Sequence, residues 1–198
     1  MVSPAVRWER RPRIRLPLPA VRRTLAVVAT VQVRRTYLQM TRRDELVPAR
    51  ADDPRVRFDH AVECPASFYL YLYREVGRPW HWVDRLGWSE EEARRHLARP
   101  GIGVWVLVHD GSPAGFFELA AHEDGSTEIA YLGLLPEFIG RGLGKALVTA
   151  AVETAWARGA NRVWLHTCTL DHPSAFASYT ARGFRPFKEE TYTADVSA

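Results

Sequence analysis

Residues 134–147 read Leu134-Leu135-Pro136-Glu137-Phe138-Ile139-Gly140-Arg141-Gly142-Leu143-Gly144-Lys145-Ala146-Leu147. An apolar run from Ile129 enters this stretch, and a helical pattern leaves it and continues to about Arg158. The stretch therefore predicts a strand, a loop with three alternate glycines and the start of a helix. Glycine lets a ligand approach the backbone closely, and the first N–H groups of a helix have no internal partner. We expect a phosphate-binding site here, to which Arg141 and Lys145 add positive charge.

Two common nucleotide motifs do not fit this loop. A Walker A loop places Ser or Thr after Gly-Lys, whereas Ala146 follows Gly144-Lys145 and offers no hydroxyl to magnesium. The dinucleotide fingerprint requires a third glycine three residues after Gly144, where Leu147 stands. The loop therefore belongs to another kind of phosphate site.

A second motif lies downstream and reads Ala175-x-x-x-Tyr179-x-x-x-Gly183-Phe184. Together with Leu134-Leu135-Pro136 and the glycine loop, it resembles the pyrophosphate loop and the tyrosine helix of the GNAT superfamily of N-acetyltransferases. The resemblance extends from about Val104 to Phe187. Two positions depart from it, because Ile139 stands where the family has Gln or Arg, and His172 stands where it has Asn.

The resemblance implies that acetyl-coenzyme A is the co-substrate and that no metal takes part. It also implies that Tyr179 protonates the leaving thiolate, and that a main-chain amide near Leu134 donates to the thioester oxygen. The residues implied in coenzyme A binding are Leu132, Leu134, Leu135, Ile139, Gly140, Arg141, Gly142, Leu143, Gly144, Lys145, His172, Ala175 and Tyr179.

The sequence leaves the base that deprotonates the amine open. Glu128 begins the run Glu128-Ile129-Ala130-Tyr131-Leu132, which resembles the strand that carries the catalytic glutamate in the histone acetyltransferase branch. A surface glutamate at the exposed edge of a strand explains Glu128 about equally well. His166 and Glu118 are the alternative bases, and a water chain is another. Histidine titrates near neutral pH, which suits a base, although a histidine in a strand is more often structural.

An unusually aromatic segment, residues 68–88, precedes the predicted hairpins. Helical spacing can bury part of it, but the three rings of Trp80-His81-Trp82 lie in a loop and cannot all face one core. Aromatic faces also attract an ammonium group. We expect an amine acceptor, either a small amine with an apolar or aromatic body or a peptide amine, which attacks the thioester directly in a ternary complex. Its predicted contacts are Trp80, Trp82, Tyr73 and Glu118. The sequence does not decide between acetyl and a longer acyl group, and a homodimer stays open.

The remaining patterns complete an α/β (α+β) domain over residues 25–198. Pro65 and Gly77 bracket one helix, Ser89 and Glu92 form a capping box for a second, and a further helix is predicted from Asp171–Pro173 to Gly183. Asp110-Gly111 predicts a hairpin turn. Strands are predicted at 56–58, 104–108, 113–119, 127–135, 162–167 and 184–190, with one or two within 26–40. We expect a mixed sheet of six to seven strands flanked by four helices. Its N-terminal part is antiparallel, and strands 127–135 and 162–167 are parallel.

Composition narrows the class of protein. A hydrophobic content of 46% and a charged content of 25% are typical of a globular domain. The longest apolar runs fall short of the roughly 20 residues of a membrane span. Cys64 and Cys168 form neither a disulfide framework nor a metal-binding spacing. We therefore expect a reduced, cytoplasmic protein with no membrane contact.

The positive charge is concentrated near the N-terminus. Residues 1–50 hold 12 arginines and three acidic residues, a balance of +9, so the remainder must carry −5 to reach the total of +4. Residues 1–24 predict an Arg/Pro-rich arm outside the domain. The arm lacks the interleaved aromatic residues that stack on bases, so nucleic-acid binding is not favoured. Two alternatives to an N-acetyltransferase remain: a coenzyme-A-binding regulatory module without turnover, and a nucleic-acid-binding protein that uses this arm.

Overall fold

The predicted strand, glycine loop and helix form the centre of the fold. In the computed structural model, which describes residues 28–197, strand β5 (Ser126–Leu134) leads through a short 3-10 turn (Pro136–Phe138) into helix α3 (Leu143–Ala157). Strand β6 (Arg162–Cys168) follows α3 and lies parallel to β5. The predicted parallel pair is confirmed.

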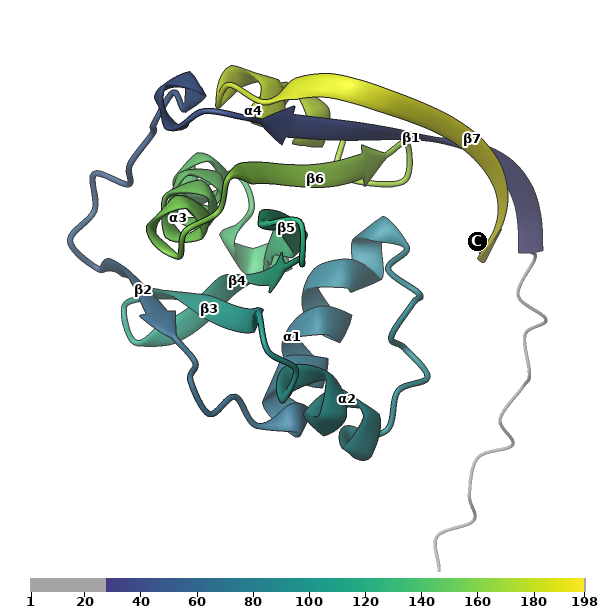
Figure 1. The fold of residues 1–198 in the computed structure, drawn as a ribbon. Coiled ribbons are helices and arrows are strands. Elements are labelled where there is room, and N and C mark those ends of the chain that lie inside the picture. The colour runs from purple at the N-terminus through teal and green to yellow at the C-terminus, as the bar shows by residue number, and fades with distance from the viewer. Residues whose placement is uncertain (1–27, 198) are drawn as a thin grey trace, which may run out of the picture.

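Seven strands form one sheet in the order β2-β3-β4-β5-β6-β1-β7 (Figure 1). Strands β2 to β5 are an antiparallel meander. The predicted hairpin turn is present, because Asp110 (φ 51°) and Gly111 (φ 81°) both adopt positive φ between β3 and β4. The mixed sheet and its four α-helices match the predicted fold class. The other elements are β1 (Val28–Met40), β2 (Val56–His60), α1 (Ala66–Gly77), α2 (Glu90–Leu97), β3 (Ile102–His109), β4 (Ser112–Ala121), α4 (Ala175–Ala181) and β7 (Arg185–Ser197).

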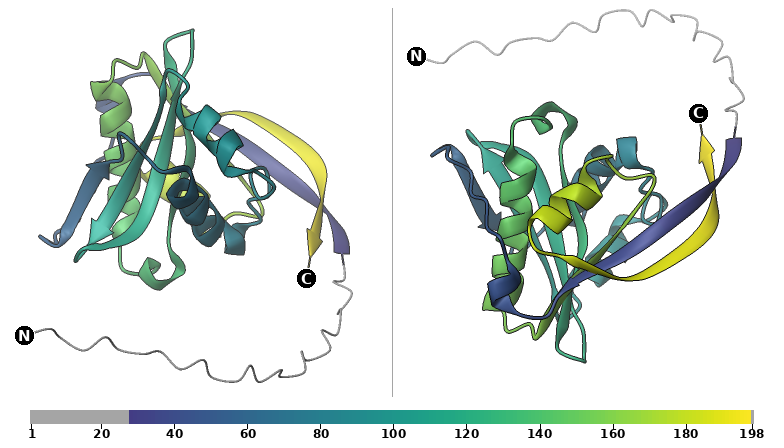
Figure 2. Two further views of the ribbon diagram at one scale, coloured as in Figure 1. Left: turned by 90° about the horizontal axis from the view of Figure 1, so that it is seen from below. Right: turned by 90° about the horizontal axis from the view of Figure 1, so that it is seen from above.

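Helices cover both faces of the sheet (Figure 2). Helix α3 is apolar over most of its surface, and its Leu147, Ala151 and Val152 pack in a core with the inward residues of β4, β5 and β6. Helices α1 and α2 lie on the opposite face, where Tyr69, Leu72 and Val76 pack against Val104, Val106 and Phe116. The sheet is therefore the middle layer, and the glycine loop emerges at one of its ends.

The one or two strands predicted within residues 26–40 are a single strand. Residues 28–40 form this 13-residue strand, which lies between β6 and β7. It pairs with β6 only over Arg35–Met40 but with β7 over Val28–Gln39. Strand β7 correspondingly extends to Ser197, beyond the predicted end at Glu190. Residues 28–34 and 191–197 therefore form a two-stranded ribbon that curves away from the rest of the sheet (Figures 1 and 2).

Helix α4 begins later than predicted. Asp171 belongs to the preceding turn, because its carboxylate accepts hydrogen bonds from the Thr167 hydroxyl (2.7 Å) and the Cys168 N–H (2.8 Å). His172 Nδ1 accepts from the Ser174 N–H at 3.1 Å. These turn contacts place the first helical residue at Ala175.

Two further predictions concern the N-terminal arm and membrane-spanning helices. The arm predicted over residues 1–24 lies outside the described residues. Within residues 28–197, no helix is both long and apolar enough to cross a membrane.

Candidate active site

A cavity of about 580 Å³ opens where the two parallel strands separate. β5 and β6 pair only over Ser126–Glu128 and Arg162–Trp164, so the later residues of both strands diverge. The cavity runs between Ile129–Leu134 of β5 and Leu165, His166 and Cys168 of β6. Residues of the glycine loop, α4, the loop after α1 and the β1–β7 ribbon complete its walls.

The diverging strand leaves backbone groups free in the cavity wall. The Leu135 N–H donates to the Ala114 carbonyl of β4 at 2.9 Å. Successive N–H groups of a strand point in opposite directions, so the N–H of Leu134, and that of Leu132 two residues earlier, point away from β4. Among the described strands, only β6 lies on that side, and it has diverged there. Leu132 and Leu134 therefore present donors to a ligand in the gap.

The glycine loop forms one end of the cavity. Gly140 (φ 82°) and Gly142 (φ 74°) adopt left-handed backbone conformations, and Gly142 is the N-cap of α3. A non-glycine residue would strain the backbone at Gly142, so the sequence and the turn are matched. The predicted residues Ile139, Gly140, Gly142, Gly144 and Lys145 all line the cavity. The loop therefore presents helix N–H groups and a lysine to the same space.

Two of the predicted donor-site residues lie on the other side of the loop. Arg141 and Leu143 line a second hollow of about 450 Å³, together with Arg50, Arg55 and His109. Leu135 lines neither space, because it is buried in the core beneath α1. Gly142 and Lys145 border both spaces, so the loop separates them.

Tyr179 reaches the cavity from α4, beside the predicted residues His172 and Ala175. Burial, with Asp171 as a second cause, raises the pKa of the Tyr179 phenol. The phenol is therefore protonated at neutral pH and can donate a proton. Cys168 also lines the cavity, and burial raises the pKa of its thiol.

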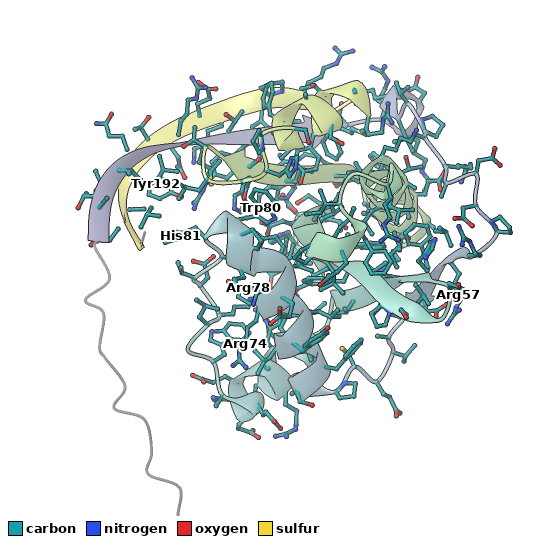
Figure 3. The ribbon with its side chains drawn as sticks, turned by 180° about the vertical axis from the view of Figure 1, so that it is seen from behind. Arg57, Arg74, Arg78, Trp80, His81 and Tyr192 are labelled. Atoms are coloured by element: carbon teal, nitrogen blue, oxygen red, sulfur yellow. The ribbon has the colours of Figure 1, made fainter. Side chains whose placement is uncertain are left out.

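The loop after α1 closes the cavity on the side opposite the β1–β7 ribbon. Trp80 packs edge-on against His172, with ring centroids 4.8 Å apart, so this contact bridges the α1 side and the α4 side. Trp82 packs against Tyr131 of β5 at 4.9 Å. Figure 3 shows Trp80 and His81 beyond the end of α1 and Tyr192 on the ribbon facing the same region. Both predicted tryptophans line the cavity.

Glu128 and His166 lie together, but only His166 lines the cavity. Glu128 Oε1 is 3.7 Å from His166 Nδ1, and Glu128 Oε2 is 3.4 Å from His122 Nε2. Glu128 therefore lies behind the imidazole that faces the cavity. This arrangement connects the two bases that the sequence left as alternatives.

Glu118 and Tyr73 lie elsewhere than predicted. The Glu118 side chain is fully buried, and it accepts hydrogen bonds from Arg85 Nη1 (2.6 Å) and the Tyr69 hydroxyl (2.6 Å). Its second oxygen is 2.9 Å from His96 Nε2. Tyr73 is also fully buried, and its hydroxyl accepts the Arg85 N–H at 3.1 Å. Because neither residue lines the cavity, neither can contact an acceptor there.

Sequence reasoning missed Arg35, Asp84 and Tyr192, which also line the cavity. A signal was available for Arg35, since it occupies the same alternating set of strand positions as Val31, Val33 and Tyr37. Tyr192 and Asp84 offered no comparable pattern. Across residues 28–197, no cluster of three or more His, Cys, Asp or Glu side chains is arranged to hold a metal ion.

Comparison with solved structures identifies the same fold in known proteins. A GCN5-related N-acetyltransferase from Sphaerobacter thermophilus superposes with a TM-score of 0.65 and 16% identity, covering 86% of this chain and 54% of that chain. One from Kribbella flavida gives a TM-score of 0.59 and 21% identity, covering 85% and 59%. At these identities the likeness concerns the fold alone.

Relatives that match by sequence have higher sequence identity to this chain but are much longer than it. Mycothiol acetyltransferase of Frankia casuarinae is 31% identical over 124 residues, which cover 56% of this chain and 34% of that protein. N-acetylaspartate synthetase of Rattus norvegicus is 33% identical over 91 residues, which cover 46% and 30%. The chain thus spans about a third of the length of these curated relatives. Residues 68–184, more than half of the chain, match the acetyltransferase (GNAT) family. The chain therefore belongs to the GNAT family of acetyltransferases.

Proposed function

We propose that the protein is an N-acetyltransferase that transfers an acetyl group from acetyl-coenzyme A to an amine. The observation that carries this proposal is one continuous cavity, which runs from the glycine loop at the start of α3 to His166 between the diverging strands β5 and β6. Family membership and relatives that are named acetyltransferases support the same reaction. An acyl donor with a phosphate tail and an amine acceptor would meet within this cavity.

The donor side fits coenzyme A in three respects. The N–H groups at the start of α3 and Lys145 offer partners for a pyrophosphate. The free backbone edge at Leu132 and Leu134 suits the amide groups of an extended pantetheine arm. The same edge can donate a hydrogen bond to the thioester oxygen as negative charge develops there. When bound, acetyl-coenzyme A supplies an acyl group that its thioester has already activated.

His166 and Glu128 are suited to remove the proton from the amine. An amine must be neutral to attack, and of the histidines that line the cavity His166 is the one on the diverging strand β6, with Glu128 beside it. The Glu128 carboxylate lies 3.7 Å from Nδ1, where it can help to orient the ring. This division makes His166 the base and Glu128 its positioning residue.

Tyr179 is suited to protonate the thiolate that leaves. Its raised pKa keeps the phenol protonated at neutral pH. The raised pKa of the Cys168 thiol argues against an acyl-enzyme, because the thiolate is the nucleophilic form. Direct attack by the amine in a ternary complex therefore fits these side chains better than a covalent route.

Trp80 and Trp82 favour an acceptor with an apolar or aromatic body, either a small amine or a peptide amine. Both rings line the cavity on the side of the loop after α1. The names of the relatives refer to different compounds, mycothiol in one case and N-acetylaspartate in the other, so they do not select one acceptor. The aromatic wall is the evidence for this acceptor class.

The donor site can be tested with a matched pair of glycine substitutions. Gly142 (φ 74°) and Gly111 (φ 81°) both have left-handed backbones, so valine at either should destabilise the fold by about 1–2 kcal/mol or more through strain. Only Gly142 lies in the glycine loop before α3, whereas Gly111 lies in the turn between β3 and β4. Gly142→Val should weaken acetyl-coenzyme A binding about tenfold or more in calorimetry, and Gly111→Val should leave it unchanged.

Thiol release with a panel of amines completes the test. The wild-type protein should release coenzyme A only when an acceptor is present. If both valine variants bind acetyl-coenzyme A as the wild type does, the loop is not the donor site. Tight binding without thiol release from any amine would instead identify a regulatory module.

A further inference from the structure

We propose that the acceptor carries a carboxylate, which Arg35 binds with the help of Tyr192 while the amine faces His166. Arg35 extends from β1 and Tyr192 from β7, so these two paired strands supply this part of the cavity wall. The inference rests on the proposed function, and it names the class of acceptor that the same cavity would take.

The guanidinium of Arg35 has N–H donors that lack a good hydrogen-bond partner. Nη1 is 3.4 Å from Glu190 Oε1, and Nη2 is 3.3 Å from the Tyr192 hydroxyl, so both contacts are longer than an ordinary hydrogen bond. Nε is buried and has no hydrogen-bond partner among residues 28–197. Five N–H donors in a planar fork match the two oxygens of a carboxylate. The Tyr192 ring lies under the guanidinium, 4.8 Å from its carbon, and fixes its plane.

The charge around Arg35 is also incompletely balanced. Glu190 is shared, because it accepts a hydrogen bond from the Tyr37 hydroxyl (2.6 Å) and lies 3.2 Å from Lys188 Nζ. Two cations, Arg35 and Lys188, therefore share one carboxylate, which leaves a net charge of +1. A partly enclosed positive charge attracts an anionic group more strongly than an exposed one.

The strand register places Arg35 near His166. Arg35 faces Cys168 across the β1–β6 ladder, and Tyr37 faces His166. Arg35 and His166 are therefore diagonal neighbours across the ladder. The Cα atoms of such neighbours typically lie about 7–8 Å apart. The rings of Tyr37 and His166 lie 5.6 Å apart, so His166 and these alternate residues of β1 share one face of the sheet. An amino acid is of a size to reach both Arg35 and His166.

The opposite wall of the cavity offers the competing possibility. Asp84 lines the cavity from the loop after α1 and accepts a hydrogen bond from the Tyr131 hydroxyl at 3.2 Å. A polyamine would use Asp84 to hold its second ammonium group and would gain nothing from Arg35. The two classes of acceptor therefore predict opposite dependence on these two residues.

The experiment compares the 20 L-amino acids with their α-amides, which keep the amine and the side chain but lose the carboxylate. For each accepted amino acid, the wild-type protein should show kcat/KM about 10- to 100-fold above that of the amide. Arg35→Gln should remove most of this preference while leaving the KM for acetyl-coenzyme A unchanged. Arg34→Gln is the matched control, because Arg34 is an exposed neighbour on the same strand. It should keep the full preference.

A binding measurement separates this inference from the proposed function. Tryptophan fluorescence with coenzyme A present should report tighter binding of the amino acids than of their amides, whether or not turnover follows. If acids and amides are bound and used equally by the wild type, the inference is overturned without any variant. A panel in which no amino acid binds, or a preference for spermidine that Asp84→Asn abolishes, overturns it as well. Acetyl-coenzyme A binding and the melting temperature show whether Arg35→Gln remains folded.

Discussion

Tyr179 and His166 approach the cavity from different elements, and each is suited to one of the two proton transfers. The phenol of Tyr179 is held protonated by burial, whereas His166 has a carboxylate behind its Nδ1 atom. Neither role depends on how tightly the donor binds. Substitutions at these residues should therefore affect turnover more than affinity.

Replacing Tyr179 tests this separation. Tyr179→Phe removes only the hydroxyl, so we expect kcat to fall about 10²–10⁴-fold while the Kd for coenzyme A stays within about threefold. Because the pKa of Tyr179 is raised, its acid form persists well above neutral pH. Wild-type activity should therefore not decline between pH 8 and pH 10 through loss of this proton. A fall in that interval that Tyr179→Phe abolishes would contradict the assignment, and stopped-flow thiol release would measure it.

Individual site residues were predictable where the chemistry fixes both residue and spacing. Gly142 and Tyr179 are such cases, because a left-handed N-cap and the Tyr-x-x-x-Gly-Phe spacing leave recognisable patterns, and both residues line the cavity. Glu118 is the opposite case. Its environment depends on Arg85, which is 33 positions earlier in the chain. The sequence near Glu118 does not predict that contact.

The loop between α1 and α2 is held to the sheet by a buried ion pair. Arg85 is 8% exposed and Glu118 is fully buried, and the guanidinium also lies 4.4 Å from the centre of the Tyr131 ring. This loop carries Trp82 and Asp84 to the cavity wall. Arg85 is therefore expected to position the acceptor wall without touching the acceptor.

Breaking that pair should have two effects. Arg85→Met leaves the Glu118 carboxylate buried without its cation, so we expect a loss of about 3–5 kcal/mol in the free energy of unfolding. The acceptor KM should also rise while the Kd for coenzyme A is unchanged. Arg57→Met is the control, because the Arg57–Asp59 pair is exposed and should contribute less than about 1 kcal/mol. Similar urea denaturation midpoints for the two variants would refute the special role of the buried pair.

Elements that neighbouring residues determine, such as caps and turns, were predicted well. The strand that lies beside a given strand was predicted less well. The capping box at Ser89 and the Asp110-Gly111 turn are formed by neighbouring residues, and both are present. The position of β1 between β6 and β7 depends on strands more than 120 residues away. Periodicity identifies a strand but contains no information about which strand lies beside it.

At the scale of the whole molecule, β1 joins the sheet to its last strand. It pairs with β6 on one edge and with β7 along nearly its whole length on the other. Val33 and Leu38 of β1 are fully buried. The sheet therefore cannot be completed until both ends of the domain are present.

Proteolysis can test this dependence. A chain that stops after Gly183 lacks β7, so the bonds at Arg34 and Arg35 should become sensitive to trypsin, whereas the full chain protects them within its ladder. Arg50 lies in an irregular segment and should be cut at similar rates in both, which makes it the internal control. Equal protection of Arg34 and Arg35 in the two chains would show that β6 alone holds β1 in place.

The same pairing has a consequence during synthesis on the ribosome. β1 is translated early, but β6 begins at Arg162, and 121 residues separate it from Met40. At about 5–20 residues per second, β1 would wait roughly 6–24 s for its first partner and longer for β7. Throughout that interval the strands against which its apolar side chains pack have not yet been synthesised. Soluble yield in the cell should therefore depend on elongation speed and on chaperones that shield a nascent strand.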